Sequence, residues 1–195
     1  MSILTKSQLY NFRNSTRTFS KGITDSLNEF KNESNIGKTT VFLSHKHNEL
    51  QELDSAISLL KKLGVNIYID WLDRNMPNVT SGETARRIKL KIKENNKFIL
   101  LATEGAIASR WCNWELGFGD THKYFDNIAI FPIRENNTNF SGSEYLEIYP
   151  RIEYVYASTV SRRIGGYFEE GYYVISPTDD EGSSTYLKLT YWLTR

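Results

Sequence analysis

Hydrophobic residues follow two different patterns along the chain from Lys38 onward. Short continuous apolar runs predict buried strands at residues 39–43, 65–70, 98–103, 128–133 and 152–156. Between these runs, apolar residues recur every three or four positions, which is the period of a helix with one buried face. Alternating strands and helices predict an α/β fold, in which helices cover both faces of a mostly parallel sheet.

Capping and turn-forming residues mark the ends of the predicted helices. Asn48 is placed to cap a helix that Gly64 ends, and Ser81 is placed to cap the next one. A third helix carries Trp111 and Glu115, which are four positions apart. Residues at this spacing share one helix face, so the indole and the carboxylate are predicted to project together near the end of the strand at 98–103.

The two ends of the chain carry weaker patterns. Four apolar residues have the spacing of an amphipathic helix that packs on the protein's own core: Phe19, Ile23, Leu27 and Phe30. The tyrosine-rich tail contains many turn formers, so we expect short strands or a hairpin, then a helical or extended piece near residues 186–193. The predicted organisation is an N-terminal helical extension (1–37), a central domain (38–157) and a C-terminal extension packed on that domain (158–195).

Composition excludes several classes of protein. The chain has 24 basic and 23 acidic residues spread along its length, without the basic stripe that a nucleic-acid backbone requires. Cys112 is the single cysteine, which excludes an internal disulfide and fits a reducing cytosol. No stretch approaches the roughly 18 apolar residues of a membrane span. We therefore expect a cytoplasmic protein with no nucleic-acid or membrane partner.

The residues that follow the first predicted strands are candidates for a binding site. In open α/β sheets, ligands bind outside the carboxyl ends of the strands, where the strand order reverses. The side chains expected at that edge are polar or aromatic: Ser44, His45, Lys46, Asp70, Trp71, Trp111 and Glu115. Each one alone also fits a capping or packing role, but their convergence on one edge favours a site.

Two segments carry a resemblance to a known family. Residues 41–49, VFLSHKHNE, resemble the first box of bacterial Toll/interleukin-1 receptor (TIR) domains. Residues 109–117, SRWCNWELG, are similar to the tryptophan and glutamate segment of TIR domains that consume NAD. Residues 70–81 correspond to the family's BB loop. The resemblance covers roughly residues 38–157.

The resemblance implies a fold and an activity. The implied fold is a flavodoxin-like TIR fold with a five-stranded parallel sheet and helices on both faces. The implied activity is cleavage of the bond between nicotinamide and ribose, with NAD+ as substrate, no cofactor, and Glu115 as the catalytic glutamate. The implied substrate-binding residues are Phe42, Ser44, His45, Lys46, Asp70, Trp71 and Trp111.

One carboxylate is sufficient for this reaction. Ordinary glycoside hydrolysis uses a pair of carboxyl groups, because the leaving oxygen must be protonated while the sugar centre is stabilised. Nicotinamide leaves NAD+ as a neutral base, so no general acid is needed. An ionised Glu115 can bind the ribose hydroxyls and stabilise the positive charge that develops on the sugar.

The resemblance also implies partners, and it leaves alternatives open. Bacterial family members often act in antiphage defence systems such as Thoeris, where a separate effector senses a cyclic or conjugated ADP-ribose. Many family members need self-association through the TIR domain to complete their site. The product, whether free ADP-ribose, a cyclic form or a conjugate, stays open because water exclusion decides it. The alternative function is a non-catalytic TIR scaffold that acts by self-assembly and partner docking.

Other kinds of site fit the sequence poorly. A P-loop at residues 35–40 would need glycine at position 32, where Asn32 stands. A receiver-type phosphoacceptor site would need an acidic pair at the end of the first strand, where Ser44 and His45 stand. The three histidines have no cysteine or carboxylate at a recognisable ligand spacing, so we expect no metal site. We expect Cys112 to be a packing residue and not a nucleophile.

Overall fold

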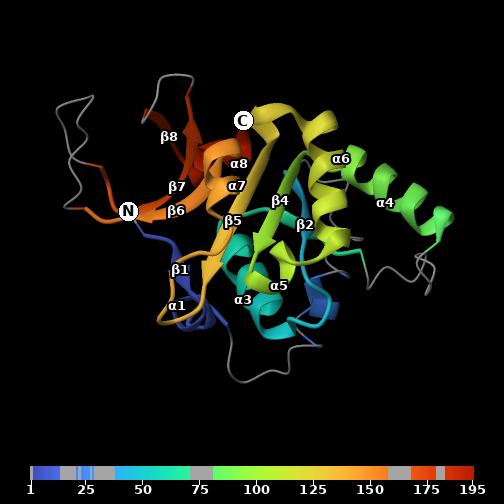
Figure 1. Cartoon of the computed structure of the whole chain (residues 1–195), viewed down its shortest axis with the longest axis horizontal. Helices are drawn as coiled ribbons and strands as arrows, with labels where there is room; N and C mark the ends of the chain where they lie inside the picture. The colour runs from blue at the N-terminus through green and yellow to red at the C-terminus, as the bar shows by residue number, and fades with distance from the viewer. Residues whose placement is uncertain are drawn as a thin grey trace.

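The computed structural model of the chain describes residues 2–13, 21, 23–26, 28, 38–70, 81–157, 168–178 and 183–195. One twisted sheet runs through this part of the molecule, with helices on both sides (Figure 1). The sequence-based prediction of an α/β protein is therefore confirmed.

Five strands form the parallel part of the sheet. Their order across the sheet is β3-β2-β4-β5-β6, and each pairs in parallel with its neighbour. These strands are β2 (Thr40–Ser44), β3 (Asn66–Tyr68), β4 (Lys97–Ala102), β5 (Ile128–Arg134) and β6 (Arg151–Val155). All five lie where the apolar runs predicted them, because continuous apolar sequence is what a strand buried on both faces requires.

The prediction of a five-stranded, wholly parallel sheet is wrong for the chain, because the described sheet is mixed and has eight strands. The tail supplies β7 (Gly171–Pro177) and β8 (Ser184–Lys188), which continue the sheet beyond β6 in antiparallel pairing. Near the N-terminus, β1 (Leu4–Thr5) pairs in parallel with the end of β5. Strand β7 gives hydrogen-bond partners to the backbone of β6, which would otherwise be the open edge of the parallel part of the sheet.

Alternate residues of the central strands enter two separate hydrophobic clusters. Val41 and Leu43 of β2 face one cluster, and Phe42 between them faces the other. The first cluster is covered by α1 (Lys6–Tyr10), α3 (Leu50–Lys61) and α8 (Leu189–Thr194). The second is covered by α4 (Gly82–Glu94), α5 (Glu104–Ile107), α6 (Arg110–Asn127) and α7 (Ser143–Ile148). The period of two along each strand thus places helices on both faces of the sheet.

Two of the three predicted helix boundaries are confirmed. The Ser81 hydroxyl accepts a hydrogen bond from the Thr84 amide at 3.2 Å, and Gly64 follows α3 with φ +83°. Asn48, however, does not cap α3. The N-cap is Glu49, which makes no side-chain capping bond because its carboxylate accepts a hydrogen bond from Thr103 instead.

The ends of the chain join the main core. The tail forms the predicted hairpin (β7 and β8) and a final helix, and Trp192 and Leu193 of that helix are buried in the first cluster. In the predicted N-terminal amphipathic helix, Ile23 is buried in the same cluster. The other three apolar positions of that helix, Phe19, Leu27 and Phe30, lie outside the described residues. In the described ranges, no helix is both long and apolar enough to cross a membrane.

Two glycines of α6 give a matched test of this packing. A Cβ added at Gly119 would lie 3.1 Å from the ring of the fully buried Phe98, whereas a Cβ at Gly117 would meet nothing within 4 Å. We expect Gly117→Ala to stabilise the protein by about 0.5–1 kcal/mol, because alanine favours the helix. Gly119→Ala gains the same propensity but crowds Phe98, at a cost of about 1–3 kcal/mol.

Urea unfolding of the two variants measures this difference directly. The expected order of unfolding free energy is Gly117→Ala highest and Gly119→Ala lowest, with the wild type between them. Equal stability of the two variants would contradict the close approach of α6 to β4.

Candidate active site

The candidate site lies at the carboxyl end of β2. In the sheet, β2 lies between β3 and β4, so the chain leaves β2 toward one neighbour and reaches the other later. Strand order reverses at this point, which opens a crevice in sheets of this kind. Ser44 ends β2, Asp70 follows β3 and Thr103 follows β4, so three polar residues meet at one edge.

Glu115 reaches this edge from α6. The Ser44 hydroxyl donates a hydrogen bond to Oε2 of Glu115 at 2.6 Å. One helical turn earlier, the Cys112 thiol donates to the backbone oxygen of His45 at 3.3 Å. Ser109 caps the helix by accepting from the Cys112 amide, so the start of α6 is fixed against the end of β2.

The Glu115 carboxyl is buried in an unfavourable place for a charge. Glu115 is only 2 % exposed, and its Oε1 atom has no hydrogen-bond partner among the described residues. Burial, and next the negative charge of Asp70, raise the pKa of Glu115 well above its usual range, while the hydrogen bond from Ser44 and the nearby Trp111 indole act in the opposite direction. Such a shifted, incompletely bonded acid is typical of a functional site.

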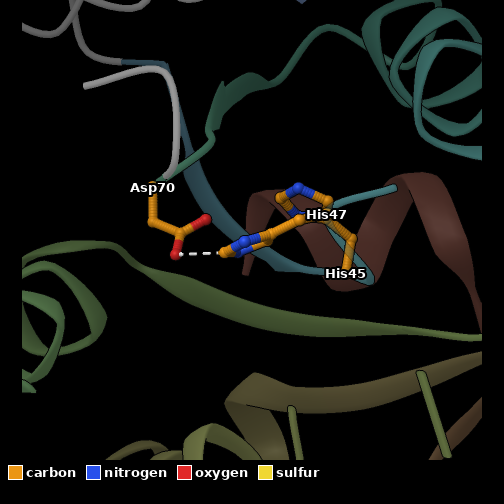
Figure 2. A group of neighbouring side chains, drawn as sticks. All are labelled: His45, His47 and Asp70. Carbon is orange, nitrogen blue, oxygen red and sulfur yellow. Dashed lines mark ion pairs between the residues drawn. The ribbon is translucent and has the colours of Figure 1, made fainter. Parts of the chain in front are cut away.

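Two histidines and Asp70 form a second group at the same edge (Figure 2). His47 Nε2 lies 3.5 Å from Asp70 Oδ2, and the hydrogen bond to Asp70 raises the pKa of His47. His45 is 3 % exposed, and burial lowers its pKa. Its Nδ1 lies 2.9 Å from the backbone oxygen of Leu43, whereas Nε2 has no hydrogen-bond partner in the described residues.

Glu49 is a further residue of this edge that sequence reasoning missed. Its carboxylate accepts a hydrogen bond from Thr103, and burial raises its pKa. Gly105 lies so close that an added Cβ would be 2.3 Å from Glu49 Oε1 and 3.5 Å from the stem of Lys46. The loops after β2 and β4 are therefore joined by this carboxylate. The sequence signal is the acid at the end of the first box, which by itself indicates only the start of a helix.

The structure brings together most of the predicted site residues. Ser44 and Glu115 are in direct contact. Asp70 is close enough for its negative charge to act on both Glu115 and the buried His45. Trp111 is half-buried, and its ring stacks on Trp114 with centroids 4.8 Å apart. Lys46 is half-buried beside the loop after β4.

Phe42 is a predicted site residue that is not part of this group, and Cys112 is a packing residue within it. Phe42 is 1 % exposed and stacks on Phe98 in the second hydrophobic cluster, so its visible role is packing. Trp71 lies outside the described residues. Burial raises the pKa of the Cys112 thiol to about 11, which suits the packing role expected for it and leaves little thiolate at neutral pH.

Comparison of the sequence with protein-family models and with curated proteins gives no match in either case.

Proposed function

We propose that the protein is an NAD+ nucleosidase with Glu115 as its catalytic residue. The observation that carries the proposal is the buried Glu115 carboxyl, held by Ser44 at the end of β2 with one oxygen unpartnered among the described residues. A solvated helix residue would not be held in this way, since burying a carboxyl without full hydrogen bonding is costly.

The arrangement of the strands supports the same proposal. The five parallel strands follow the order of flavodoxin-like sheets, whose ligands bind at the point where strand order reverses. Glu115 lies at that point. Together with the two TIR-like segments, this placement supports a TIR-type fold with two antiparallel strands added at one edge.

The proposed reaction uses the residues of the site as follows. NAD+ carries a positive nicotinamide ring, and its approach favours the ionised form of Glu115 despite the raised pKa of the free acid. The carboxylate then stabilises positive charge on the ribosyl centre as nicotinamide departs with the bonding electron pair. The Ser44 hydroxyl holds the carboxylate in position, and Trp111 supplies a flat surface for a ring of the nucleotide.

The resemblance to bacterial TIR domains supports a wider proposal for the product. The ribosyl centre, once formed, is captured by water to give ADP-ribose or by another nucleophile to give a cyclic or conjugated form. A cyclic or conjugated product would serve as a signal for a separate effector in antiphage defence. Self-association through the TIR-like domain would complete the site.

Incubation of the purified chain with NAD+ tests the proposal. We expect mass spectrometry to detect free nicotinamide together with an ADP-ribosyl product. If self-association completes the site, the rate of nicotinamide release per chain should rise with protein concentration. The mass of the second product separates hydrolysis, which adds water, from cyclisation, which does not. Absence of nicotinamide release at all concentrations, also with extract of infected cells, would favour a non-catalytic scaffold.

Trp111→Ala is expected to weaken the use of NAD+ more than it weakens folding. Loss of a stacking surface costs about 1–3 kcal/mol of binding, so kcat/KM should fall about 5- to 150-fold. Trp114→Ala is the matched control, because Trp114 belongs to the same aromatic stack along α6. Steady-state kinetics and thermal unfolding of both variants give the comparison. Equal effects of the two substitutions on kcat/KM would assign Trp111 to packing alone.

A further inference from the structure

We propose that His45, His47 and Asp70 bind a divalent transition-metal ion, with Zn²⁺ as the best chemical match. One ligand atom from each residue lies within 4.8 Å of the other two. The two histidines follow β2 and the aspartate follows β3, so the pairing of these strands creates the group. The proposal does not rest on NAD+ cleavage, because it concerns metal binding alone.

His45 has the features of a prepared metal ligand. Its Nδ1 lies 2.9 Å from the Leu43 backbone oxygen, which accepts a hydrogen bond from the protonated nitrogen. In this tautomer Nε2 carries the lone pair, and Nε2 is the buried atom without a partner in the described residues. Ligating histidines commonly use a backbone carbonyl in this way to fix the orientation and tautomer of the ring. An unpartnered buried nitrogen has no comparable structural use.

The spacing of the other two ligands suits zinc. With bonds of about 2.0–2.1 Å to nitrogen and oxygen, two ligand atoms of a tetrahedral site lie about 3.3 Å apart. His47 Nε2 and Asp70 Oδ2 are 3.5 Å apart. The side chain of His47 is 52 % exposed, so its ring has room to turn toward His45. Figure 2 shows the His47 ring between His45 and Asp70.

The donor set selects the type of ion. Two imidazoles and one carboxylate favour zinc and its neighbours among transition metals, whereas Mg²⁺ and Ca²⁺ prefer oxygen ligands. Three protein ligands would leave a fourth position for water or for an oxygen of a bound molecule. The sequence-based expectation of no metal site looked for a cysteine or carboxylate at a recognisable spacing from the histidines. Asp70, which is 23 positions beyond His47, is the ligand that the fold adds.

Metal binding by the full chain, without a histidine tag, tests the proposal. After treatment with a chelator, the protein is titrated with Zn²⁺ in competition with a chromophoric chelator, and with Co²⁺ followed by visible absorption. We expect one Zn²⁺ per chain and the intense absorption of tetrahedral Co²⁺. His47→Ala and Asp70→Asn should each weaken Zn²⁺ binding by more than about 100-fold, beyond the range of outer-shell changes.

His122→Ala is the matched control, because His122 is a half-buried histidine on α6 that stacks on Phe118 away from the group. It should bind Zn²⁺ like the wild type. Circular dichroism verifies that each variant is folded, and the exposed His47 makes His47→Ala the variant least able to disturb the core. Failure of the wild type to bind Zn²⁺, or equal binding by wild type, His47→Ala and His122→Ala, would overturn the proposal.

Discussion

Replacing Glu115 with glutamine is expected to reduce nicotinamide release from NAD+ by about 10²- to 10³-fold, the effect of losing one preorganised electrostatic group. Glutamine has the same size and can still accept a hydrogen bond from Ser44, so the geometry of the site is retained. It cannot carry the negative charge that stabilises the ribosyl centre. Nicotinamide release at saturating NAD+, measured across protein concentrations, gives the comparison.

The same substitution is expected to leave the fold intact and to stabilise it at neutral pH. The pKa of Glu115 is raised above its ordinary value of 4.5 by burial. At pH values between 4.5 and the raised pKa of the folded state, the folded protein binds more protons than the unfolded chain. The wild type therefore loses stability as pH rises through this range. The glutamine side chain of the variant does not titrate. The difference in Tm between variant and wild type should therefore grow as pH increases from about 4.5.

Activity provides an independent check on the ionisation of Glu115. The pH dependence of kcat/KM reports the pKa values of essential groups in the free enzyme. We therefore expect kcat/KM to rise with pH through the raised pKa of Glu115. The proposal would be contradicted if the wild type and Glu115→Gln released nicotinamide equally. A variant that is inactive and also unfolded would not match the expectation either, because the expected loss is one of chemistry alone.

Phe98→Ala is expected to lower the free energy of unfolding by about 3–5 kcal/mol, as large-to-small changes in a core do. Phe98 is fully buried in β4 and stacks on Phe42 of β2 with ring centroids 5.6 Å apart. A Cβ added at Gly119 would lie 3.1 Å from the Phe98 ring, so α6 also packs closely on Phe98. Alanine would leave a cavity between the two elements that hold Ser44 and Glu115 together.

Urea unfolding measures this loss, with Phe125→Ala as the matched control. Phe125 is near the end of α6 and is 47 % exposed, so its loss should cost less than about 1 kcal/mol. Similar losses for the two variants would mean that Phe98 is not the packing residue inferred from its burial. Since a domain of this size has a stability of only about 5–15 kcal/mol, Phe98→Ala should also enlarge the unfolded population in cells.

Local sequence was sufficient to predict the five parallel strands and three of the helices between them, α3, α4 and α6. Strand β4, for example, is a continuous apolar run that can only be buried on both faces, and Ser81 could be recognised as a cap from its chemistry. The prediction for Asn48 was wrong because its neighbour Glu49 starts the helix and is bonded to Thr103, which is 54 positions away. No local pattern contains such a contact.

The candidate site divides in the same way. Sequence determined that Trp111 and Glu115 share one helix face and that Ser44 and Asp70 end strands, because these properties follow from the periods of helix and strand. Only the tertiary structure decided that Glu115 is buried against Ser44 and that Phe42 belongs to the core. It also decided that Asp70 completes a group with the two histidines, and that the tail continues the sheet in antiparallel pairing. The physical reason is that burial and charge coupling depend on which strand ends become neighbours, and strand order is set by long-range packing of the whole chain.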